Sequence, residues 1–320
     1  MRVRLSSEDV EVLMKAQYEF PVSPEPFRDM AESLGMVEGR LLSRLRRLKE
    51  LGVVKRIGYY LNYRSQRRVA ALVALRLPGP SIDKLRNLTA GDRDVTHSYL
   101  RGHPRYNVWI VVKKNNRAEL EEYVYRLARA VGAEDHVILY GKRTYKLSVK
   151  YDLRRGISWS IQGRLPEKVP SLEELGVSEG LVRDLCKGLP LKPSPYSDIA
   201  SKYGLALDEL LELVEELLRK GVLADPGAAL DGDKLGFRSN AMAVLPCDEC
   251  CGWVADNVAE ATHVVLRKTV PGKWEYPCYF MVHARRRGAV YEVARRVFEN
   301  LGVEGELLFS LENLKPGVVR

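Results

Sequence analysis

Apolar side chains recur every three or four residues in the segment before residue 52. They are Leu41, Leu42, Leu45 and Leu48. This is the spacing of a helix that buries one face. Gly35 ends an earlier, shorter helix and Gly52 ends this one, as glycines commonly do at helix C-termini. The next residues, VVKRIGYYLNY, are rich in β-forming side chains, so the pattern predicts a winged helix-turn-helix over residues 1–62.

The chain beyond this wing alternates between β-rich and helical patterns. Strand, helix, strand, strand, helix and strand are predicted in VAALVALRL, SIDKLRNL, VTHSYLR, YNVWIVVK, AELEEYVYRLARAVG and HVILY. This βαββαβ order is that of a ferredoxin-like unit. We therefore expect a ferredoxin-like domain at residues 63–151.

The sequence pattern of both predicted domains then recurs in the second half of the chain. FPVSPEPFRDMAESLG, which begins at Phe20, matches LPLKPSPYSDIASKYG with a shift of 169 residues, and the match continues without a gap to Val222. RLARAVGAEDHVILY, which begins at Arg126, matches RVFENLGVEGELLFS with a shift of 170 residues. A fixed shift of this kind indicates a tandem duplication.

The duplication sets the expected fold class and domains. The chain is predicted to be α+β, with each half a winged helix-turn-helix followed by a ferredoxin-like domain. A polar linker is expected at 152–175, the second winged helix-turn-helix at 176–228 and the second ferredoxin-like domain at 229–320. Their sheets should pair within the chain as an intrachain pseudo-dimer, and a further homo-oligomer is compatible with the sequence.

Charge narrows the class of partner. The 320 residues carry 51 Lys and Arg against 42 Asp and Glu, a net charge of +9 with a pI near 9.2. Such a balance favours a polyanion, either a nucleic acid or a small molecule with several carboxylates. No apolar run is long enough to span a bilayer, and the first residues lack the pattern of a signal peptide. We expect a cytoplasmic protein that does not bind membranes.

Cysteine usage leaves two interpretations open. The five cysteines are an odd number, which argues against a fully paired secreted framework. Cys247, Cys250 and Cys251 in CDECC, with Cys278, have spacing that a metal or redox site could use. One such pair without a second is weak support, so these residues are otherwise small loop side chains and no metal site is predicted. Cys186 is expected in a helix core.

The helix-turn-helix modules suggest a first function, that of a DNA-binding transcription regulator of the Lrp/AsnC type. The recognition helix of the first copy carries cations suited to phosphate oxygens: Arg40, Arg44, Arg46, Arg47 and Lys49. The equivalent helix of the second copy carries acids that oppose the approach to DNA: Asp208, Glu209, Glu212, Glu215 and Glu216. We expect weak or no binding to nucleic acid, with both modules retained as scaffold and interface.

A second function is suggested by THSYLRGHPRYNVW. Alternation along a strand places His97, Tyr99 and Arg101 on one face. On the returning strand one face is predicted to carry Arg105, Asn107 and Trp109, and the other Tyr106 and Val108. A face that mixes imidazole, phenol, guanidinium and indole suits a flat ring bearing carboxylates better than it suits an apolar helix.

The second copy varies this pattern. His263 and Arg267 keep the interval of His97 and Arg101, while Val265 stands where Tyr99 does. Its returning strand is predicted to place four residues on one face: Pro277, Tyr279, Met281 and His283. Trp274 and Tyr276 come just before them. A lone buried histidine is usually structural, but recurrence of His-x-x-x-Arg with an aromatic strand in both copies favours a binding role.

These motifs resemble a known family. FPVSPEPFRDMAESLG, RLKELGVVKRIGYY and THSYLRGHPRYNVW resemble the first subunit type of siroheme decarboxylase, a family of Lrp/AsnC-like enzymes. GFRSNAMAVLP, THVVLR, WEYPCYFMVH and LLFSLENLK resemble the second subunit type. The chain thus looks like a fusion of the two. The resemblance implies decarboxylation of two acetate side chains of siroheme to didecarboxysiroheme, in alternative haem or haem d1 biosynthesis. It implies no added cofactor, since iron enters with the substrate.

The resemblance also assigns roles to residues of this sequence. The candidate proton donors are His97, His103, His263 and His283, since histidine titrates near neutrality. The candidate substrate-binding residues are Tyr99, Arg101, Tyr106, Asn107, Trp109, Arg267, Trp274, Tyr276 and Tyr279. THVVLR and WEYP depart from the family pattern in the second copy. We nevertheless favour the pocket around His263 and His283, because WEYPCYFMVH offers the larger aromatic surface. The alternative is an Lrp/AsnC-type regulator that responds to a tetrapyrrole.

Overall fold

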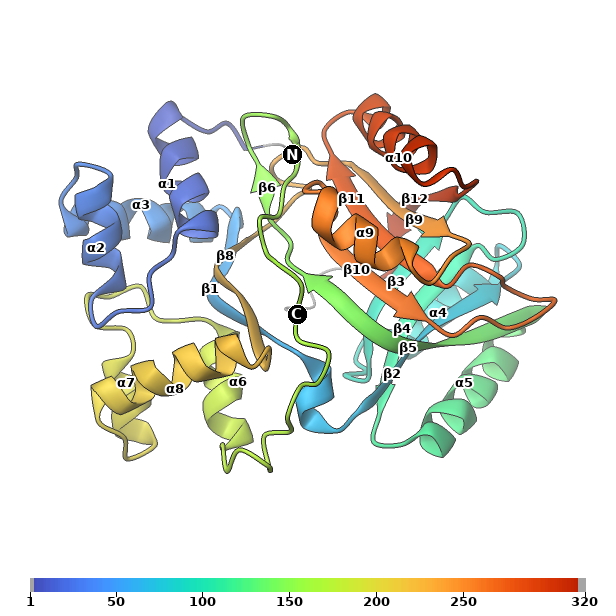
Figure 1. Cartoon of the computed structure of the whole chain (residues 1–320), viewed down its shortest axis with the longest axis horizontal. Coiled ribbons are helices and arrows are strands. Elements are labelled where there is room, and N and C mark those ends of the chain that lie inside the picture. Colours follow the sequence, from blue (N-terminus) through green and yellow to red (C-terminus); the bar gives the residue numbers. More distant parts are fainter. Residues whose placement is uncertain (1–2, 316–320) are drawn as a thin grey trace.

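The computed structural model describes residues 3–315 and begins with a three-helix unit (Figure 1). This unit consists of α1 (Ser7–Tyr18), α2 (Pro26–Ser33), α3 (Glu38–Glu50) and the wing strand β1 (Val54–Leu61). The predicted leucines of α3 are its buried residues. Gly52 follows α3 at a φ of 71°, which glycine adopts without strain.

The second copy repeats these elements. It consists of α6 (Glu179–Lys187), α7 (Ser197–Lys202), α8 (Leu207–Arg219) and β8 (Leu223–Leu230). Both three-helix units share one hydrophobic core, which includes Leu45 of α3 and Val214 of α8. The buried hydroxyl groups of Tyr59 and Tyr196 are hydrogen bonded across the two units.

The two wings are exchanged between the units. β1 and β8 pair antiparallel, with Gly58 opposite Gly227. A Cβ atom on Gly58 would lie 2.6 Å from the carbonyl oxygen of Leu185 in α6, and one on Gly227 would collide with the carbonyl oxygen of Ala16 in α1. Each wing strand therefore packs closely on a helix of the other unit, and glycine is required for that approach.

Each ferredoxin-like unit has the predicted βαββαβ order. The first contains β2 (Val69–Arg76), α4 (Ser81–Thr89), β3 (Val95–Arg101), β4 (Val108–Lys114), α5 (Arg117–Val131) and β5 (Asp135–Leu147), and a 3-10 turn η1 (Tyr63–Gln66) precedes it. The second contains β9 (Ser239–Leu245), α9 (Cys250–Asn257), β10 (His263–Arg267), β11 (Cys278–Ala284), α10 (Arg287–Leu301) and β12 (Glu306–Asn313). The expected α+β tandem fold is confirmed.

The two sheets close on each other as a barrel (Figure 1). Neighbouring strands follow the order β10-β5-β2-β4-β3-β12-β9-β11, and β10 also pairs with β11. The seams β3–β12 and β10–β5 join the two copies. The outer faces are covered by α4 and α5 in the first copy and by α9 and α10 in the second. The inner faces enclose a separate core that includes Leu72, Trp109 and Met242.

The segment predicted as a polar linker is attached to the barrel. Its first strand β6 (Tyr151–Asp152) pairs with β7 (Ile157–Ser158), and β7 pairs with β11. The side chain of Gln17 in α1 both donates to and accepts from the backbone of Tyr151. The linker therefore fixes the helical units to the barrel. Within residues 3–315 no helix is long and apolar enough to cross a membrane.

Candidate functional site

The inner face of the barrel gathers most of the predicted site residues. On β3, the pairs His97–Val111 and Tyr99–Trp109 place His97 and Tyr99 on the inner face with Trp109 of β4. Arg101 follows by alternation. The sequence placed these residues on one face, and the structure shows that this face is enclosed by the second copy.

Arg101 anchors the first cluster, which we define as His97, Tyr99 and Arg101. The residue is 4% exposed. Its guanidinium donates from Nη1 to the carbonyl oxygen of Leu308 at 2.8 Å and has its central carbon 5.2 Å from the ring centre of Tyr99. Nδ1 of His97 is 2.9 Å from the hydroxyl of Thr96. Because Leu308 lies on β12, Arg101 reaches from one copy to the other.

Arg267 anchors the second cluster, which we define as His263, Arg267 and Tyr279. Nη1 of Arg267 donates to the carbonyl oxygen of Leu139 at 3.3 Å, and Leu139 lies on β5 of the first copy. The register sets Val265 directly opposite Tyr279 on β11. The tyrosine missing at Val265 is thus supplied by the neighbouring strand.

Three buried polar groups lie at or beside this second cluster. Among residues 3–315, Nε of Arg267 is buried without a hydrogen-bond partner, and the only side-chain partner of the buried Tyr279 hydroxyl is the indole N–H of Trp274. Burial lowers the pKa of the Arg267 guanidinium below its ordinary value. Burial also raises the pKa of Tyr279, which the neighbouring Arg267 opposes. Nε of Arg267 is therefore a buried donor that the described part of the chain does not satisfy.

The hairpin histidine of the first copy is held by its neighbours. Nδ1 of His103 accepts hydrogen bonds from the backbone N–H groups of Arg105 and Tyr106, at 3.2 and 3.1 Å. Its Nε2 is 3.1 Å from the carboxylate of Glu306, and its ring meets Trp274 edge-on at 5.2 Å. Burial lowers the pKa of His103, and Glu306 opposes this shift. A neutral ring that donates from Nε2 satisfies all these contacts.

The prediction that Tyr106 and Trp109 lie on opposite faces was wrong. Both belong to the inner core, with ring centres 6.4 Å apart. β4 begins only at Val108, so Tyr106 belongs to the turn and strict alternation does not reach it. The Tyr106 hydroxyl donates to Asp135 at 2.8 Å. The side-chain amide of Asn107 binds the backbone of Leu77 through both its oxygen and its nitrogen.

His263 and His283 share the inner face of the second copy. They lie on the adjacent strands β10 and β11, in a register where His263 is diagonal to His283. The His283 ring is 5.8 Å from that of Tyr151, and Asn240 is its partner on β9. Oδ1 of Asn240 is buried without a hydrogen-bond partner. The structure therefore places these two predicted histidines on the same face of adjacent strands.

Sequence reasoning missed two charged residues of this face. Lys113 of β4 pairs with Ala70 in the register that places Trp109 inward, and its Nζ lies 5.6 Å from the ring centre of Tyr63. Glu306 of β12 accepts from the Tyr276 hydroxyl at 2.8 Å while it contacts His103. Alternation from Trp109 along β4 would have identified Lys113. Glu306 could not be found this way, because it belongs to the second copy and meets His103 of the first copy only when the barrel closes.

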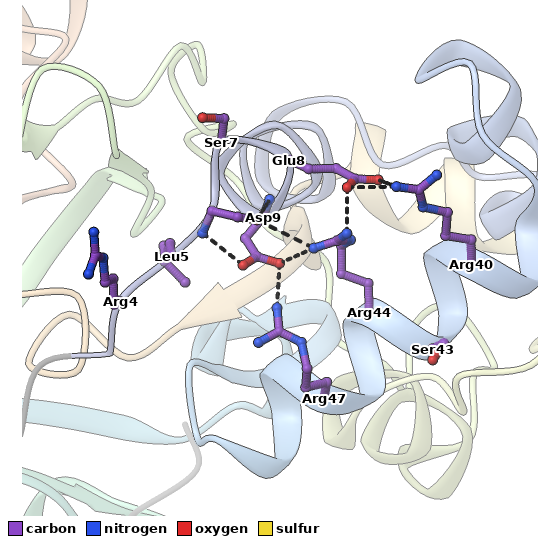
Figure 2. A pocket seen from close by; sticks show the side chains of 10 residues that line it. Arg4, Leu5, Ser7, Glu8, Asp9, Arg40, Ser43, Arg44 and Arg47 are labelled. Atoms are coloured by element: carbon purple, nitrogen blue, oxygen red, sulfur yellow. Dashed lines mark hydrogen bonds and ion pairs between the residues drawn. The ribbon is translucent and has the colours of Figure 1, made fainter.

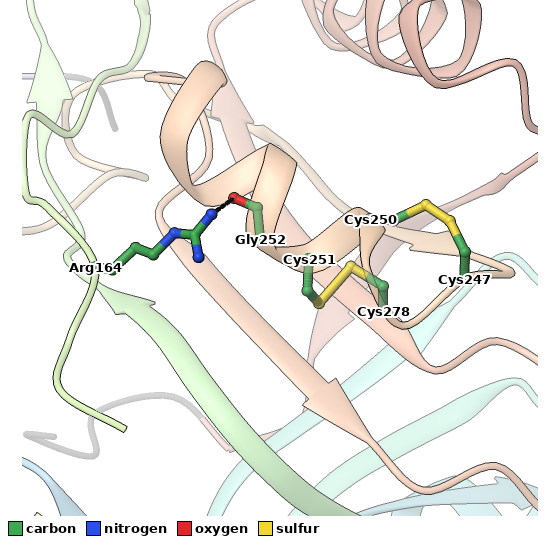
Figure 3. Close-up of a disulfide and its surroundings, with 6 residues drawn as sticks. All are labelled: Arg164, Cys247, Cys250, Cys251, Gly252 and Cys278. Atoms are coloured by element: carbon green, nitrogen blue, oxygen red, sulfur yellow. Dashed lines mark hydrogen bonds between the residues drawn. A yellow bond between two sulfur atoms is a disulfide. The ribbon is translucent and has the colours of Figure 1, made fainter. Parts of the chain in front are cut away.

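Four cysteines form two pairs around α9 (Figure 3). Cys247 is bonded to Cys250, and Cys251 in α9 is bonded to Cys278 in β11, with Cα atoms 5.4 Å apart in each pair. No group of three or more metal-ligating side chains occurs among the residues that the structure describes. Cys186 of α6 packs against the core of the helical units, where burial raises the pKa of its thiol to about 12.

The basic helix α3 is already engaged by acids of α1 (Figure 2). Asp9 lies 2.7 Å from Arg44 and 2.5 Å from Arg47, and Glu8 lies 2.9 Å from Arg40. Burial opposes the charge of Asp9, but hydrogen bonds from the Ser6 backbone and from the two arginines outweigh it and lower its pKa to about 2. These arginines form an ordered surface whose charge is partly neutralised.

Two family models match the chain in both copies. The AsnC-like ligand binding domain model matches residues 67–146 and 234–315. The siroheme decarboxylase NirDL-like HTH domain model matches residues 9–54 and 173–223. The matched segments coincide with the two barrel halves and the two helical units.

Individual relatives match over nearly the full length. The siroheme decarboxylase NirDL subunit of Paracoccus pantotrophus is 30% identical over 312 residues, which cover 94% of this chain and 93% of the relative. The siroheme decarboxylase of Hydrogenobacter thermophilus is 26% identical, with 97% and 94% covered. The NirD subunit of Pseudomonas aeruginosa, 35% identical, covers 40% of this chain and 85% of its own length.

Solved structures share the fold. The crystal structure of the siroheme decarboxylase NirDL superposes with a TM-score of 0.67 at 24% identity, and covers 97% of this chain and 92% of that one. Another crystal structure shows that protein in complex with an iron-uroporphyrin III analogue, with a TM-score of 0.65.

Proposed function

Since the chain belongs to the siroheme decarboxylase family, we propose that it removes carbon dioxide from two acetate side chains of siroheme and yields didecarboxysiroheme. Such an enzyme is a carboxy-lyase. The observation that carries the proposal is the buried contact between Arg267 and Tyr279 on the inner face, where Nε of Arg267 has no hydrogen-bond partner. An aromatic, cationic face inside a barrel suits a macrocycle with several carboxylates.

Each decarboxylation needs one proton and no electron acceptor. The bond between the acetate methylene carbon and the carboxylate carbon breaks, and the carboxylate leaves as carbon dioxide. The electron pair stays on the methylene carbon, which takes a proton and becomes a methyl group. The protein must therefore hold the ring, accommodate the developing charge and deliver a proton to carbon.

Arg101 and Arg267 are the proposed anchors for carboxylates that are retained. Each already donates one hydrogen bond to a backbone carbonyl of the other copy. Nε of Arg267 has no partner, so a carboxylate oxygen could accept its hydrogen without displacing an existing bond. Anchoring a leaving carboxylate as firmly would oppose reaction.

His263 and His283 are the proposed proton donors, ahead of His97. They lie on adjacent strands of the inner face, which also carries Tyr279 and the unpartnered Nε of Arg267. His103 is less suited, because its Nδ1 accepts two backbone hydrogen bonds and its Nε2 meets Glu306. We propose that it positions the hairpin.

No added cofactor is required in this proposal, since siroheme brings its own iron. The alternative, a DNA-binding regulator, has less support. Three arginines of α3 are engaged by Glu8 and Asp9, and α8 presents acids at the equivalent surface.

The test is to incubate the purified chain with siroheme without oxygen and follow the tetrapyrrole mass by chromatography. Two successive losses of carbon dioxide are expected, and siroheme without protein is the control. If siroheme binds but keeps its mass, the chain is a binding protein; if it does not bind, the site assignment fails as well.

A further inference from the structure

The exposed faces of α3 and α8 carry opposite charges at equivalent positions. The shift of 169 residues that relates the two copies pairs Arg40 with Glu209, Arg46 with Glu215, Arg47 with Glu216, and Glu50 with Arg219. The charges are also opposite in the pair Glu50 and Arg219, where the acid belongs to α3 and the base to α8. A solvated face has no need of such correspondence.

Both faces are open grooves on the surface. The groove at α3 encloses about 890 Å³ and is lined by Arg4, Arg40, Arg44 and Arg47 together with Glu8 and Asp9 (Figure 2). The groove at α8 encloses about 450 Å³ and is lined by Glu209, Glu212, Glu215 and Glu216 together with Arg219 and Leu213. The first is net positive and the second net negative.

The acids of α8 are available for an external partner. Glu212 and Glu215 are exposed, and neither forms an ion pair within residues 3–315. At α3, the acids of α1 hold Arg44 and Arg47 in place, so the cationic groove is preorganised. Apolar side chains flank α3, where Val37 is 72% exposed and Leu51 is 40% exposed.

We propose that these grooves bind each other between two copies of the chain, with α3 of one copy against α8 of the other. The occupant is a second copy because this chain carries both charge patterns in matching spacing. A pair of copies related by a twofold axis makes the contact twice. Duplex DNA fits less well, because its phosphates would meet the acids of α8. The inference does not depend on the proposed reaction.

Sedimentation velocity of the full chain tests the contact. We expect a dimer in about 50 mM salt and dissociation in about 500 mM salt, because exposed charge pairs are screened within a few ångströms at high ionic strength. A chain that stays monomeric at low salt and about 100 µM protein would overturn the proposal. So would a dimer that salt leaves unchanged.

Two charge-reversal variants identify the surfaces. The first carries Arg40→Glu with Ser43→Glu, and the second carries the equivalent Glu209→Arg with Glu212→Arg. Each alone should be monomeric, because its two grooves have like charge, and an equimolar mixture should form a 1:1 complex. Glu292→Arg, on the exposed surface of α10, is the control and should dimerise normally.

The equimolar mixture of the two variants distinguishes loss of the α3–α8 contact from damage to the fold. Thermal unfolding of each variant is measured first, and restoration on mixing cannot come from misfolded chains. Failure of the mixture to associate would overturn the α3–α8 pairing. Nanomolar binding of a defined DNA duplex at physiological salt, lost in the first variant, would instead identify α3 as a DNA-reading helix.

Discussion

The guanidinium carbon of Arg267 lies 5.4 Å from the ring centre of Tyr279 on the neighbouring strand. In the first copy, Arg101 makes the same contact with Tyr99 of its own strand. The two copies therefore keep the arginine and its aromatic partner but draw the tyrosine from different strands. The motif is conserved in space although the tyrosine has moved in sequence.

Replacing either arginine should weaken siroheme binding. Arg101→Ala and Arg267→Ala should each cost about 1.5–3 kcal/mol of binding free energy, the range for hydrogen bonds to charged groups. Titration followed by siroheme absorbance measures the loss. Arg76→Ala, an exposed change at the end of β2, is the control. Unchanged affinity in both cluster variants would remove the arginines from the site.

Tyr279→Phe should separate stability from binding. Within the described part of the chain the only side-chain partner of the hydroxyl is the indole N–H of Trp274, so its loss should change the free energy of unfolding by no more than about 1 kcal/mol. Siroheme binding should weaken by about 0.5–1.5 kcal/mol if the ligand satisfies that hydroxyl. Tyr276→Phe, which loses a bond to Glu306, should instead destabilise the free protein. Equal effects on stability in the two variants would contradict this account.

Loss of the proton donor should lower turnover while siroheme still binds. His97→Ala, His103→Ala, His263→Ala and His283→Ala are compared in single-turnover decarboxylation. We expect the slowest rates from the variants at His263 and His283, by about 10²-fold or more. His103→Ala should mainly lower stability, and His136→Ala is the control. Near-normal rates in all four variants would exclude histidine as the donor.

Asp9 should make the free energy of unfolding decrease at low pH. Because the pKa of Asp9 is lowered to about 2 in the folded chain, its contribution is complete above its unfolded pKa near 4 and is lost as the pH falls toward 2. The contribution is about 2 kcal/mol. Asp9→Asn should lose this amount at neutral pH and show a flatter acid limb in denaturant unfolding. Parallel curves for the two proteins would mean that the ion pairs add little.

Residues 1–155 alone should not form a stable, soluble monomer. Cutting there removes β12 and β10, so β3 and β5 become exposed edges and the inner apolar face meets water. Light scattering of each separate half should show aggregation, and mixing the halves should restore a soluble complex. A well-folded monomer from residues 1–155 would show that the seams contribute little.

The duplication allowed much of the fold to be predicted from the sequence. Alternation correctly placed His97, Tyr99 and Arg101 on one face, because all three lie within a regular strand. It failed at Tyr106, which precedes β4. The contact between Glu306 and His103 could not be predicted, because it depends on the seam that joins two distant strands.

The departure at Val265 shows the same limit. In the sequence, Val265 stands where the first copy has Tyr99, which suggested that the second copy had lost the aromatic partner of its arginine. The contact is restored by the cross-strand register, which sets Tyr279 of β11 opposite Val265 as it sets Trp109 opposite Tyr99. Side-chain pattern alone does not give that register.

The two seams of the barrel form within one polypeptide, and this allows the two halves to differ in sequence. A covalent connection holds complementary edges at an effective concentration on the order of millimolar, so pairing does not depend on how much protein a cell makes. Every barrel also receives one half of each kind and never two alike. His283 can therefore stand where the other half has Lys113, because no barrel has to be built from two halves of one kind.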